Sequence, residues 1–332
     1  MKHILMSHGA GGWEMGELIR QVFVATYGPP DFQPDDCAFL KWEGSRLAFT
    51  IDSYVVDPLF FPGGDIGRLA VAGTVNDLLT AGARPLALSA SFIIEEGFGV
   101  ADLKRIAQSM AATAAEAGVA LVTGDTKVVP RGAADRLFIT TSGIGRVQGS
   151  GLSGAQVKPG DQLILTGPVG SHGLTVLLAR EKLLEGEDLK SDVAPLADMI
   201  LPLWDHQVPV HAMRDPTRGG LAAALNEIAR QSQVGLELWE EEIPVPPGVA
   251  AACDALGLEV LNLANEGIML IFVAPEGAFR ALELVKSSPY GREARIIGRA
   301  RDSFPGRVYL RTRLGTSRLL PFPSGELVPR IC

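Results

Sequence analysis

The sequence predicts a mixed α/β protein built from two domains. Strand-like apolar runs alternate with segments whose apolar residues recur at helical spacing, which implies helices packed on sheets. The length of 332 residues suits two domains. Hydrophobic residues make up 47% of the chain and charged residues 20%, a composition that supports packed cores and is too apolar for a disordered chain.

Charge, hydropathy and cysteine usage exclude several classes of function. A formal net charge of -8 argues against a nucleic-acid partner and means that a bound polyphosphate would need metal ions beside it. No apolar run reaches the length of a membrane span, and we expect no signal peptide at the start. The three cysteines predict a reduced, cytoplasmic protein without a disulfide framework, and none has zinc-site spacing.

Strands and helices are expected to alternate in the first half of the chain. Helical spacing of apolar residues predicts helices at 14–26, 68–81 and 102–117. Apolar runs predict strands at 47–51, 85–94, 120–122 and 137–144. The chain opens on a glycine-rich stretch at residues 8–12, where the backbone could approach a ligand closely.

A Gly-Ser-Gly sequence at residues 149–151 places the domain boundary near residue 150. We therefore expect an N-terminal domain at 1–150, a C-terminal domain at 151–312 and a flexible tail at 313–332. Helices are expected in the second domain at 174–180, 221–231 and 278–286, and a surface excursion at 181–192. Strands are expected at 162–165, 234–238, 268–273, 296–299 and 307–310.

Three aspartates of the first domain are candidate metal ligands. Asp52 closes a predicted strand, Asp65 lies at a helix entrance, and Asp77 lies inside that helix beside Asn76. Carboxylates gathered at one edge of an α/β layer repel each other unless a cation joins them, and hard oxygen ligands suit Mg²⁺. Structural explanations exist for each: a turn for Asp52, an N-cap for Asp65 and an exposed charge for Asp77. Because Asp77 interrupts an apolar run, where an unpaired charge is costly, the set favours a metal site.

Residues 124–127, Gly-Asp-Thr-Lys, form a candidate phosphate site after a predicted strand. Gly124 permits a tight turn, and Asp125, Thr126 and Lys127 follow within reach of each other. Lysine is a compact cation suited to a phosphate oxygen. The chain has neither a GxxxxGK[ST] loop nor a GxGxxG after a strand, which excludes a P-loop and a Rossmann site. The structural explanation is a surface Asp–Lys pair, which contributes little to stability.

Further polar groups lie at predicted turns. Asp215 and Arg218 precede a predicted helix and supply an acid and a guanidinium group. Glu266 lies between Asn265 and Gly267, where composition alone favours a hairpin or turn. His8 lies beside glycine and is either a phosphate-binding residue or an ordinary loop residue.

The chain ends in Pro329-Arg330-Ile331-Cys332, which places a thiol and a carboxylate together at the terminus. The stretch before it contains prolines and a glycine and is expected to be extended. Taken alone, Cys332 is explained as a residual cysteine on a frayed end. The remaining motifs indicate a nucleotide enzyme that lacks a fixed nucleophile, and they favour a thiol carried into a pocket and out again.

Together these motifs resemble the HypE family of hydrogenase maturation proteins, which belongs to the PurM-like superfamily of ATP-using enzymes. The terminal Pro-Arg-Ile-Cys is the specific marker of the family, whereas the acidic motifs are shared across the superfamily. The resemblance rests on residues 8–12, 52–56, 64–69, 76–77, 124–128, 215–220, 265–267 and 329–332. It implies a PurM-like fold and a homodimer whose N-terminal domains form the interface and the ATP cleft.

The resemblance also implies the residues that bind ATP and Mg²⁺. The implied nucleotide-binding residues are Asp52, Asp65, Gly67, Asn76, Asp77, Gly124, Asp125, Thr126, Lys127, Asp215 and Arg218. The implied metal ligands are Asp52, Asp65, Asp77 and Asp215. Lys127 would neutralise phosphate charge, Glu266 is the candidate general base, and His8 is the alternative base.

The implied activity is that of an ATP-dependent carbamoyl dehydratase, a carbon–oxygen lyase. The Cys332 thiol receives a carbamoyl group from the carbamoyltransferase HypF, and ATP phosphorylates the amide oxygen so that phosphate can leave. The resulting S-cyanide passes to the HypC–HypD complex and then to the iron of [NiFe] hydrogenase. A tail of roughly 20 extended residues spans about 65 Å, so the thiol can reach a cleft and a partner. Whether that cleft belongs to its own subunit or to the neighbour stays open.

Two other functions fit the same residues. One is a PurM-type ATP-dependent synthase that acts on a free small molecule, with Cys332 incidental. The other is a nucleotide-responsive scaffold for hydrogenase assembly, which would bind nucleotide without turnover.

Overall fold

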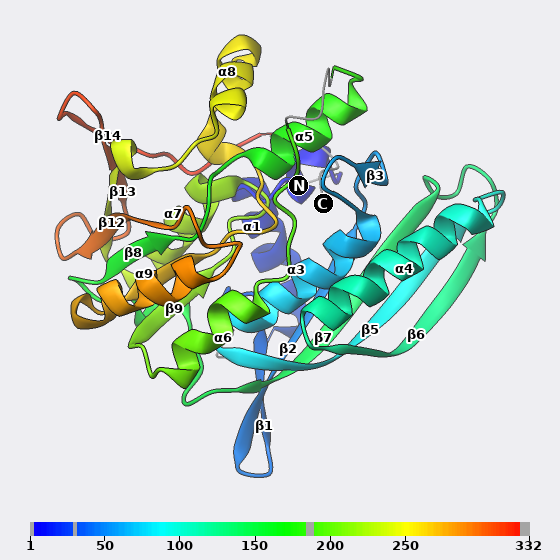
Figure 1. Ribbon diagram of the computed structural model, residues 1–332, viewed down its shortest axis with the longest axis horizontal. Coiled ribbons are helices and arrows are strands. Elements are labelled where there is room, and N and C mark those ends of the chain that lie inside the picture. The colour runs from blue at the N-terminus through cyan, green and yellow to red at the C-terminus, as the bar shows by residue number, and fades with distance from the viewer. Residues whose placement is uncertain (1–2, 29–31, 184–188, 326–332) are drawn as a thin grey trace.

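Two β-sheets, one from each half of the chain, organise the structure (Figure 1). The structure is a computed structural model, and it describes residues 3–28, 32–183 and 189–325. The first sheet has the strand order β1-β2-β7-β5-β6, and the second has the order β14-β13-β10-β12-β8-β11-β9. The predicted mixed α/β class is confirmed. The two sheets fall on either side of residue 150, which supports the domain boundary that we propose there.

The first sheet is covered on one face by two helices, α3 (Ile66–Thr80) and α4 (Val100–Glu116), as Figure 1 shows. Its strands are β1 Ala38–Trp42, β2 Ser45–Tyr54, β5 Ala83–Glu95, β6 Ala120–Val129 and β7 Leu137–Val147. A small ribbon, β3 Phe60–Phe61 with β4 Gly64–Asp65, leads into α3. Before the sheet comes one winding helical segment, made of α1 Trp13–Leu18, the π-helical turn η2 Ile19–Val24 and α2 Ala25–Tyr27.

The other face of the first sheet carries exposed apolar side chains among the residues described. In β2, the buried Ala48 and Thr50 alternate with Phe49 and Ile51, which are 39% and 61% exposed. Phe49 lies opposite Ile144 of β7, so both side chains point to this open face. The face is therefore suited to a second protein surface, because antiparallel sheets that face water usually carry polar residues there.

The second domain packs five helices around its sheet in the described part of the chain. The strands are β8 Gln162–Leu165, β9 Val210–Arg214, β10 Gly235–Trp239, β11 Leu270–Val273, β12 Arg295–Arg301, β13 Val308–Arg311 and β14 Ser317–Leu319. The helices are α5 Ser171–Arg180, α6 Ala197–Asp205, α7 Gly220–Ser232, α8 Pro247–Leu256 and α9 Ala278–Ser287. The sequence did not predict α6, which contains Pro202, or the short elements α8, β1 and β14.

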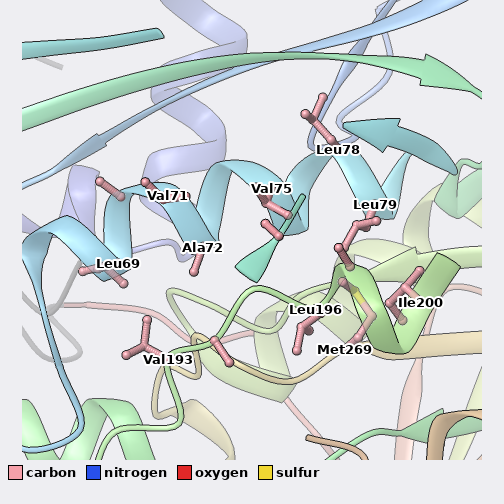
Figure 2. Packing of buried hydrophobic residues seen from close by; sticks show 14 of the residues in the cluster. Leu69, Val71, Ala72, Val75, Leu78, Leu79, Val193, Leu196, Ile200 and Met269 are labelled. Carbon is pink, nitrogen blue, oxygen red and sulfur yellow. The ribbon is translucent and has the colours of Figure 1, made fainter. Parts of the chain in front are cut away.

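Helix α3 is buried along almost its whole length because it lies between the two domains. Figure 2 shows Leu79 of α3 facing Ile200 of α6 and Met269, which precedes β11. The Asn76 amide donates to Ala194 O at 3.0 Å, and its Oδ1 accepts from Leu196 N at 2.9 Å. These contacts fix the second domain against the helix that carries Asp77.

Part of the stretch predicted to be a flexible tail, residues 313–332, packs on the second domain. Within the stretch expected to be flexible, β14 pairs antiparallel with β13, and Leu320 is only 4% exposed. The backbone hydrogen bonds of these residues are satisfied by the second sheet, which holds them in place. Residues 326–332, including Cys332, lie outside the described residues.

In the described part of the chain, no helix combines the length and the apolar character that a bilayer crossing requires.

The turn predicted at residues 124–127 is wrong, because β6 continues straight through them. The strands β5 and β6 run parallel with a register irregularity between Leu88 and Ser89. Just beyond it, a Cβ on Gly124 would lie 2.3 Å from Ala90 O. Gly124 is therefore explained by the close approach of the two strands.

We expect Gly124→Ala to destabilise the protein by about 1–3 kcal/mol, because the added methyl group forces β5 and β6 apart. Urea unfolding measures this loss, and Thr123→Ala, an exposed change on the same strand, is the matched control. Equal stability of the two variants would contradict the explanation that Gly124 allows the close approach of β5 and β6.

Candidate active site

An acidic cleft of about 830 Å³ lies where β2, the end of α3 and the loop after β9 meet the N-terminal helical segment. Its walls carry carboxylates from both domains: Asp36, Asp52, Asp77, Asp215 and Glu227. Asp52, Asp77 and Asp215 were predicted site residues. Asp36 and Glu227 were missed, and the signal that could have found Asp36 is its position beside Asp35, just before a strand.

Asp77 is a buried carboxylate, 8% exposed, and this excludes the explanation that it is an exposed helix charge. Its Oδ2 accepts from the Thr50 hydroxyl of β2 at 2.8 Å. Burial raises the pKa of Asp77 well above its usual value, and the nearby charges of Asp52 and Asp215 raise it further. The carboxylate is thus held in a place where its ionised form is disfavoured until a cation arrives.

Burial also raises the pKa values of Asp215 and Asp52. Burial raises the pKa of Asp215 to about 8, with Asp36 adding to the shift and the Arg214 guanidinium opposing it. The pKa of Asp52 is also raised, again by burial first, while Arg218 lowers it. Three acids with raised pKa values around one cleft indicate a functional site better than a structural ion-pair network.

The arginines beside the cleft compensate the negative charge of these carboxylates only in part. Arg214 is buried and donates to Asp36, to Pro34 O at 3.0 Å and to Glu227 Oε2 at 3.0 Å. Burial opposes the charge of Arg214, but these neighbours raise its pKa. Arg218 lines the cleft and donates to Gly9 O at 3.2 Å. Arg214 therefore links residues 34–36 to α7 through hydrogen bonds. It does not bind Asp52 or Asp77, so another cation is needed to compensate their charge.

The donor set of the cleft fits Mg²⁺ held together with a phosphate. Among the residues that the structure describes, no three acidic, histidine or cysteine side chains already form a metal cage. Mg²⁺ binds through one or two carboxylates, several waters and substrate phosphates, so a closed cage is not required. Asp36, Asp52, Asp77 and Asp215 supply the hard oxygen atoms that such an ion prefers.

Three predicted nucleotide-binding residues lie apart from this cluster. Asp65 caps α3, accepting from Gly67 N at 2.7 Å and Arg68 N at 3.1 Å. Twelve residues of helix separate Asp65 from Asp77, about 18 Å along the axis, too far to share one metal ion within this chain. A Cβ on Gly67 would lie 2.6 Å from Ile106 O, so that glycine serves the packing of α3 on α4. Asn76 binds backbone groups of the second domain, as described above.

Residues 124–127 do not line the cleft of their own chain. They lie on β6, at the edge of the first sheet. Asp125 and Lys127 form an exposed ion pair at 2.9 Å. Their partners in the register are Ser91 and Ile93 of β5, which places both side chains on the open face of the sheet.

Glu266 is buried beside the cleft at the domain boundary, 3% exposed, and its Oε1 has no hydrogen-bond partner among the described residues. Burial raises its pKa well above the usual value, and Asp215 and Asp192 add to the shift. Asp192 accepts from the backbone N–H groups of Glu266 and Gly267, each at 3.2 Å, and burial raises its pKa to about 6. The predicted surface excursion therefore ends in a half-buried aspartate, Asp192, whose carboxylate holds the Glu266 loop.

The other candidate groups are less favourably placed. His8 lies in the 3-10 turn η1 (Met6–Gly9), where its Nδ1 accepts from Leu5 N at 2.9 Å, and it is not among the residues that line the cleft. Cys37 and Cys253 are both buried, and burial raises the pKa of each thiol. Neither is suited to attack as a thiolate.

Comparison with known proteins agrees with this architecture. The model of the AIR synthase related protein N-terminal domain matches residues 34–147, and that of the C-terminal domain matches residues 158–311. The carbamoyl dehydratase HypE of Rhizobium leguminosarum bv. viciae is 50% identical over 98% of this chain and 94% of its own length. The chain belongs to the carbamoyl dehydratase HypE family. The HypE of Escherichia coli K12 is 46% identical over the full length of both chains.

Solved structures of HypE proteins share the fold. A crystal structure of a HypE–HypF complex has a TM-score of 0.86 and 47% identity, and covers 92% of this chain and 99% of that one. A HypE in complex with ATP has a TM-score of 0.84 and 44% identity, and covers 99% of this chain and all of that one. A thiamine-monophosphate kinase from Stenotrophomonas maltophilia, at 20% identity and a TM-score of 0.65, shares the fold alone. The predicted PurM-like fold and family membership are confirmed.

Without divalent metal, the stability of the protein should fall as the pH rises. The pKa of Asp215 is 3.8 as an ordinary aspartate and about 8 in the fold, so the folded state binds more protons between these values. Stability present at low pH is then lost as the pH rises through that window. Thermal unfolding in EDTA between about pH 6 and 8 measures the slope. Asp215→Asn should flatten it, and an unchanged slope would show that Asp215 is ionised in the fold.

Proposed function

We propose that the chain is an ATP- and Mg²⁺-dependent carbamoyl dehydratase that converts an S-carboxamide on Cys332 into an S-cyanide. The observation that carries this proposal is the cluster of buried carboxylates at one cleft, in a chain whose family relatives are named for this reaction. The ATP complex of a HypE relative supports nucleotide as the cosubstrate.

The chemistry requires that an amide lose its oxygen. The amide oxygen attacks the γ-phosphorus of ATP, ADP leaves, and the oxygen then departs with the phosphate as two N–H protons are removed. The products are an S-cyanide, ADP and phosphate. Asp52, Asp77, Asp215 and Asp36 are the residues that would hold Mg²⁺, which neutralises the charge that develops on the phosphoryl group.

Glu266 is the group best placed to take the protons. Its burial disfavours the carboxylate, so the ionised form is a stronger base than a surface glutamate. The backbone of the Glu266 loop is fixed by Asp192 and by Ala194 N, which donates to Glu266 O at 3.3 Å. Neither Glu266 nor His8 is among the residues that line the cleft. Glu266 is preferred because the charges of Asp215 and Asp52 act on it, whereas the Nδ1 of His8 accepts from Leu5 N within its own turn.

The burial of both other thiols supports Cys332 as the carrier. Cys37 Sγ donates to Asp77 O at 3.2 Å, and Cys253 packs against apolar side chains such as Leu174 and Val249. A carbamoyl group on either would have to displace packed core atoms.

The partners follow from the reaction. A solved HypE–HypF complex of a relative supports HypF as the donor of the carbamoyl group. Delivery of the cyano group to a HypC–HypD complex, and then to the iron of [NiFe] hydrogenase, remains part of the proposal. A reducing cytoplasm suits a chain whose function depends on a thiol.

A homodimer explains the open face of the first sheet and the position of Lys127. Phe49, Ile51, Ile93 and Ile144 are exposed apolar residues on that face, and Lys127 lies on it beside Ile93. Ile51 also lines the cleft. Two such faces packed together around a two-fold axis would bury the apolar residues and bring Lys127 of one subunit toward the cleft of the other. We propose that Lys127 neutralises phosphate charge in trans.

Intact mass spectrometry tests the reaction. After incubation with carbamoyl phosphate, HypF and ATP, the chain should gain one carbamoyl group, which then loses one water when Mg²⁺ and ATP are both present. Cys332→Ala should gain nothing, because the other thiols are buried.

Each alternative function has its own outcome in this experiment. An adduct on Cys37 or Cys253 would overturn the assignment to the tail. Activity on a free small molecule that survives the loss of Cys332 would favour a PurM-type synthase. Nucleotide binding without turnover would favour an assembly scaffold.

Asp77→Asn should abolish Mg-ATP turnover while leaving the fold intact, and it should raise the stability of the metal-free protein. The amide keeps the size of the side chain but cannot ionise, so it removes the cost of burying a charge beside Asp52 and Asp215. ATP hydrolysis and thermal unfolding in EDTA are the two measurements. Normal hydrolysis would remove Asp77 from the metal set.

Co-expression of Asp77→Asn with Lys127→Ala tests whether Lys127 acts in trans. If it does, each mixed dimer contains one cleft with an intact Asp77 and an intact Lys127 from the partner. Statistical mixing then restores about a quarter of the wild-type sites, although each variant alone is inactive. Inactive mixed dimers would show that Lys127 acts within its own chain.

A further inference from the structure

The described end of the tail is held by three separate parts of the protein. Leu320 N donates to Val308 O of β13 at 2.9 Å, and Leu320 O accepts from the Asn226 amide of α7 at 3.2 Å. These bonds place the next residues, Pro321 and Phe322, beside the acidic cleft, and Phe322 is one of the residues that line it.

The glycine-rich N-terminal segment forms the second contact with the tail. Trp13 N donates to Pro323 O at 3.4 Å, and Gly325 N donates to Glu14 Oε1 at 3.3 Å. A Cβ on Gly12 would lie 2.8 Å from Pro323 O. Gly12 has a φ of -103°, so the close approach of the tail, and not the backbone conformation, is what requires glycine at this position.

Arg230 of α7 forms the third contact. Its guanidinium lies 4.7 Å from the centroid of the Phe322 ring and 5.2 Å from that of Trp13. Both distances are within the range of cation–π attraction. The tail, the N-terminal segment and the second domain therefore meet at one cation, on the wall of the cleft.

We propose that Gly12, Trp13 and Arg230 are positioning residues that anchor the tail at residues 322–325, so that only the residues after Gly325 carry the thiol between the cleft and the carbamoyl donor. This inference rests on the proposed function of Cys332. The seven residues after Gly325 span at most about 23 Å, compared with about 40 Å for the twelve residues that follow Leu320. A shorter tether raises the effective concentration of the thiol at the cleft.

Hydrogen exchange of the intact protein tests whether the anchor exists. Gly12→Ala and Phe322→Ala should both speed exchange of the Trp13 and Gly325 amides, because each change displaces the tail from the N-terminal segment. Phe322→Tyr keeps a ring against Arg230 and should retain protection. Gly9→Ala is the matched glycine control, since a Cβ there meets no atom within 4 Å. Wild-type protection in both Gly12→Ala and Phe322→Ala would overturn the proposal.

Single-turnover dehydration tests what the anchor does. Chain loaded with the carbamoyl group is mixed with Mg-ATP, and the loss of one water is followed by mass. Phe322→Ala should react about twofold more slowly than wild type with the same ATP affinity, because the longer tether lowers the effective concentration of the thiol, and Phe322→Tyr should restore the rate. A wild-type rate in Phe322→Ala would overturn the role of the anchor.

Two other outcomes separate this inference from the proposed function. If the ATP affinity of Phe322→Ala falls as much as its rate, the ring belongs to the nucleotide pocket, and the anchor role is wrong. If the loaded wild-type chain loses no water at all, the proposed function is wrong, and the role of the anchor in delivery falls with it. The exchange experiment still decides whether the tail is held at Phe322.

Discussion

Mutual repulsion of buried carboxylates is the constraint on which the rest of the structure depends. Asp52 and Asp77 come from the first domain and Asp215 from the second, and burial raises the pKa of all three. Such a cluster is costly to bury without a cation. The surrounding contacts hold it in place: Thr50 donates to Asp77, Arg214 binds Asp36 and Glu227, and α3 is packed between the domains.

The burial of α3 connects the fold to the chemistry. At one end Asp65 caps the helix, and at the other Asp77 faces the cleft. Asn76 binds the backbone of Ala194 and Leu196, and Ala194 N in turn donates to Glu266 O. Candidate metal ligands and the candidate base are thus fixed to each other through backbone contacts. Catalytic groups held by rigid elements in this way need little reorganisation as charge develops.

Much of the fold follows from local sequence patterns. The apolar spacing at 68–81 and 102–117 predicted helices that the structure places at Ile66–Thr80 and Val100–Glu116, and the strand at 162–165 has the predicted bounds. Helix α6 was missed because Pro202 argues against a helix. The turn at 124–127 was wrong because Gly124 permits the close approach of a neighbouring strand, a contact between residues distant in sequence. The same distinction between local pattern and long-range packing applies to the site. Asp77 was predicted because a charge interrupts an apolar run, whereas Asp36 reaches the cleft through contacts between residues distant in sequence.

Mg-ATP binding should change how many protons the cleft carries. If the carboxylates of the cleft are partly protonated until Mg-ATP binds, binding must release protons to solution. Calorimetry at about pH 7 in buffers of different ionisation enthalpy measures this release. The account predicts net release on Mg-ATP binding, reduced in Asp215→Asn, whereas binding with no change in bound protons would contradict it.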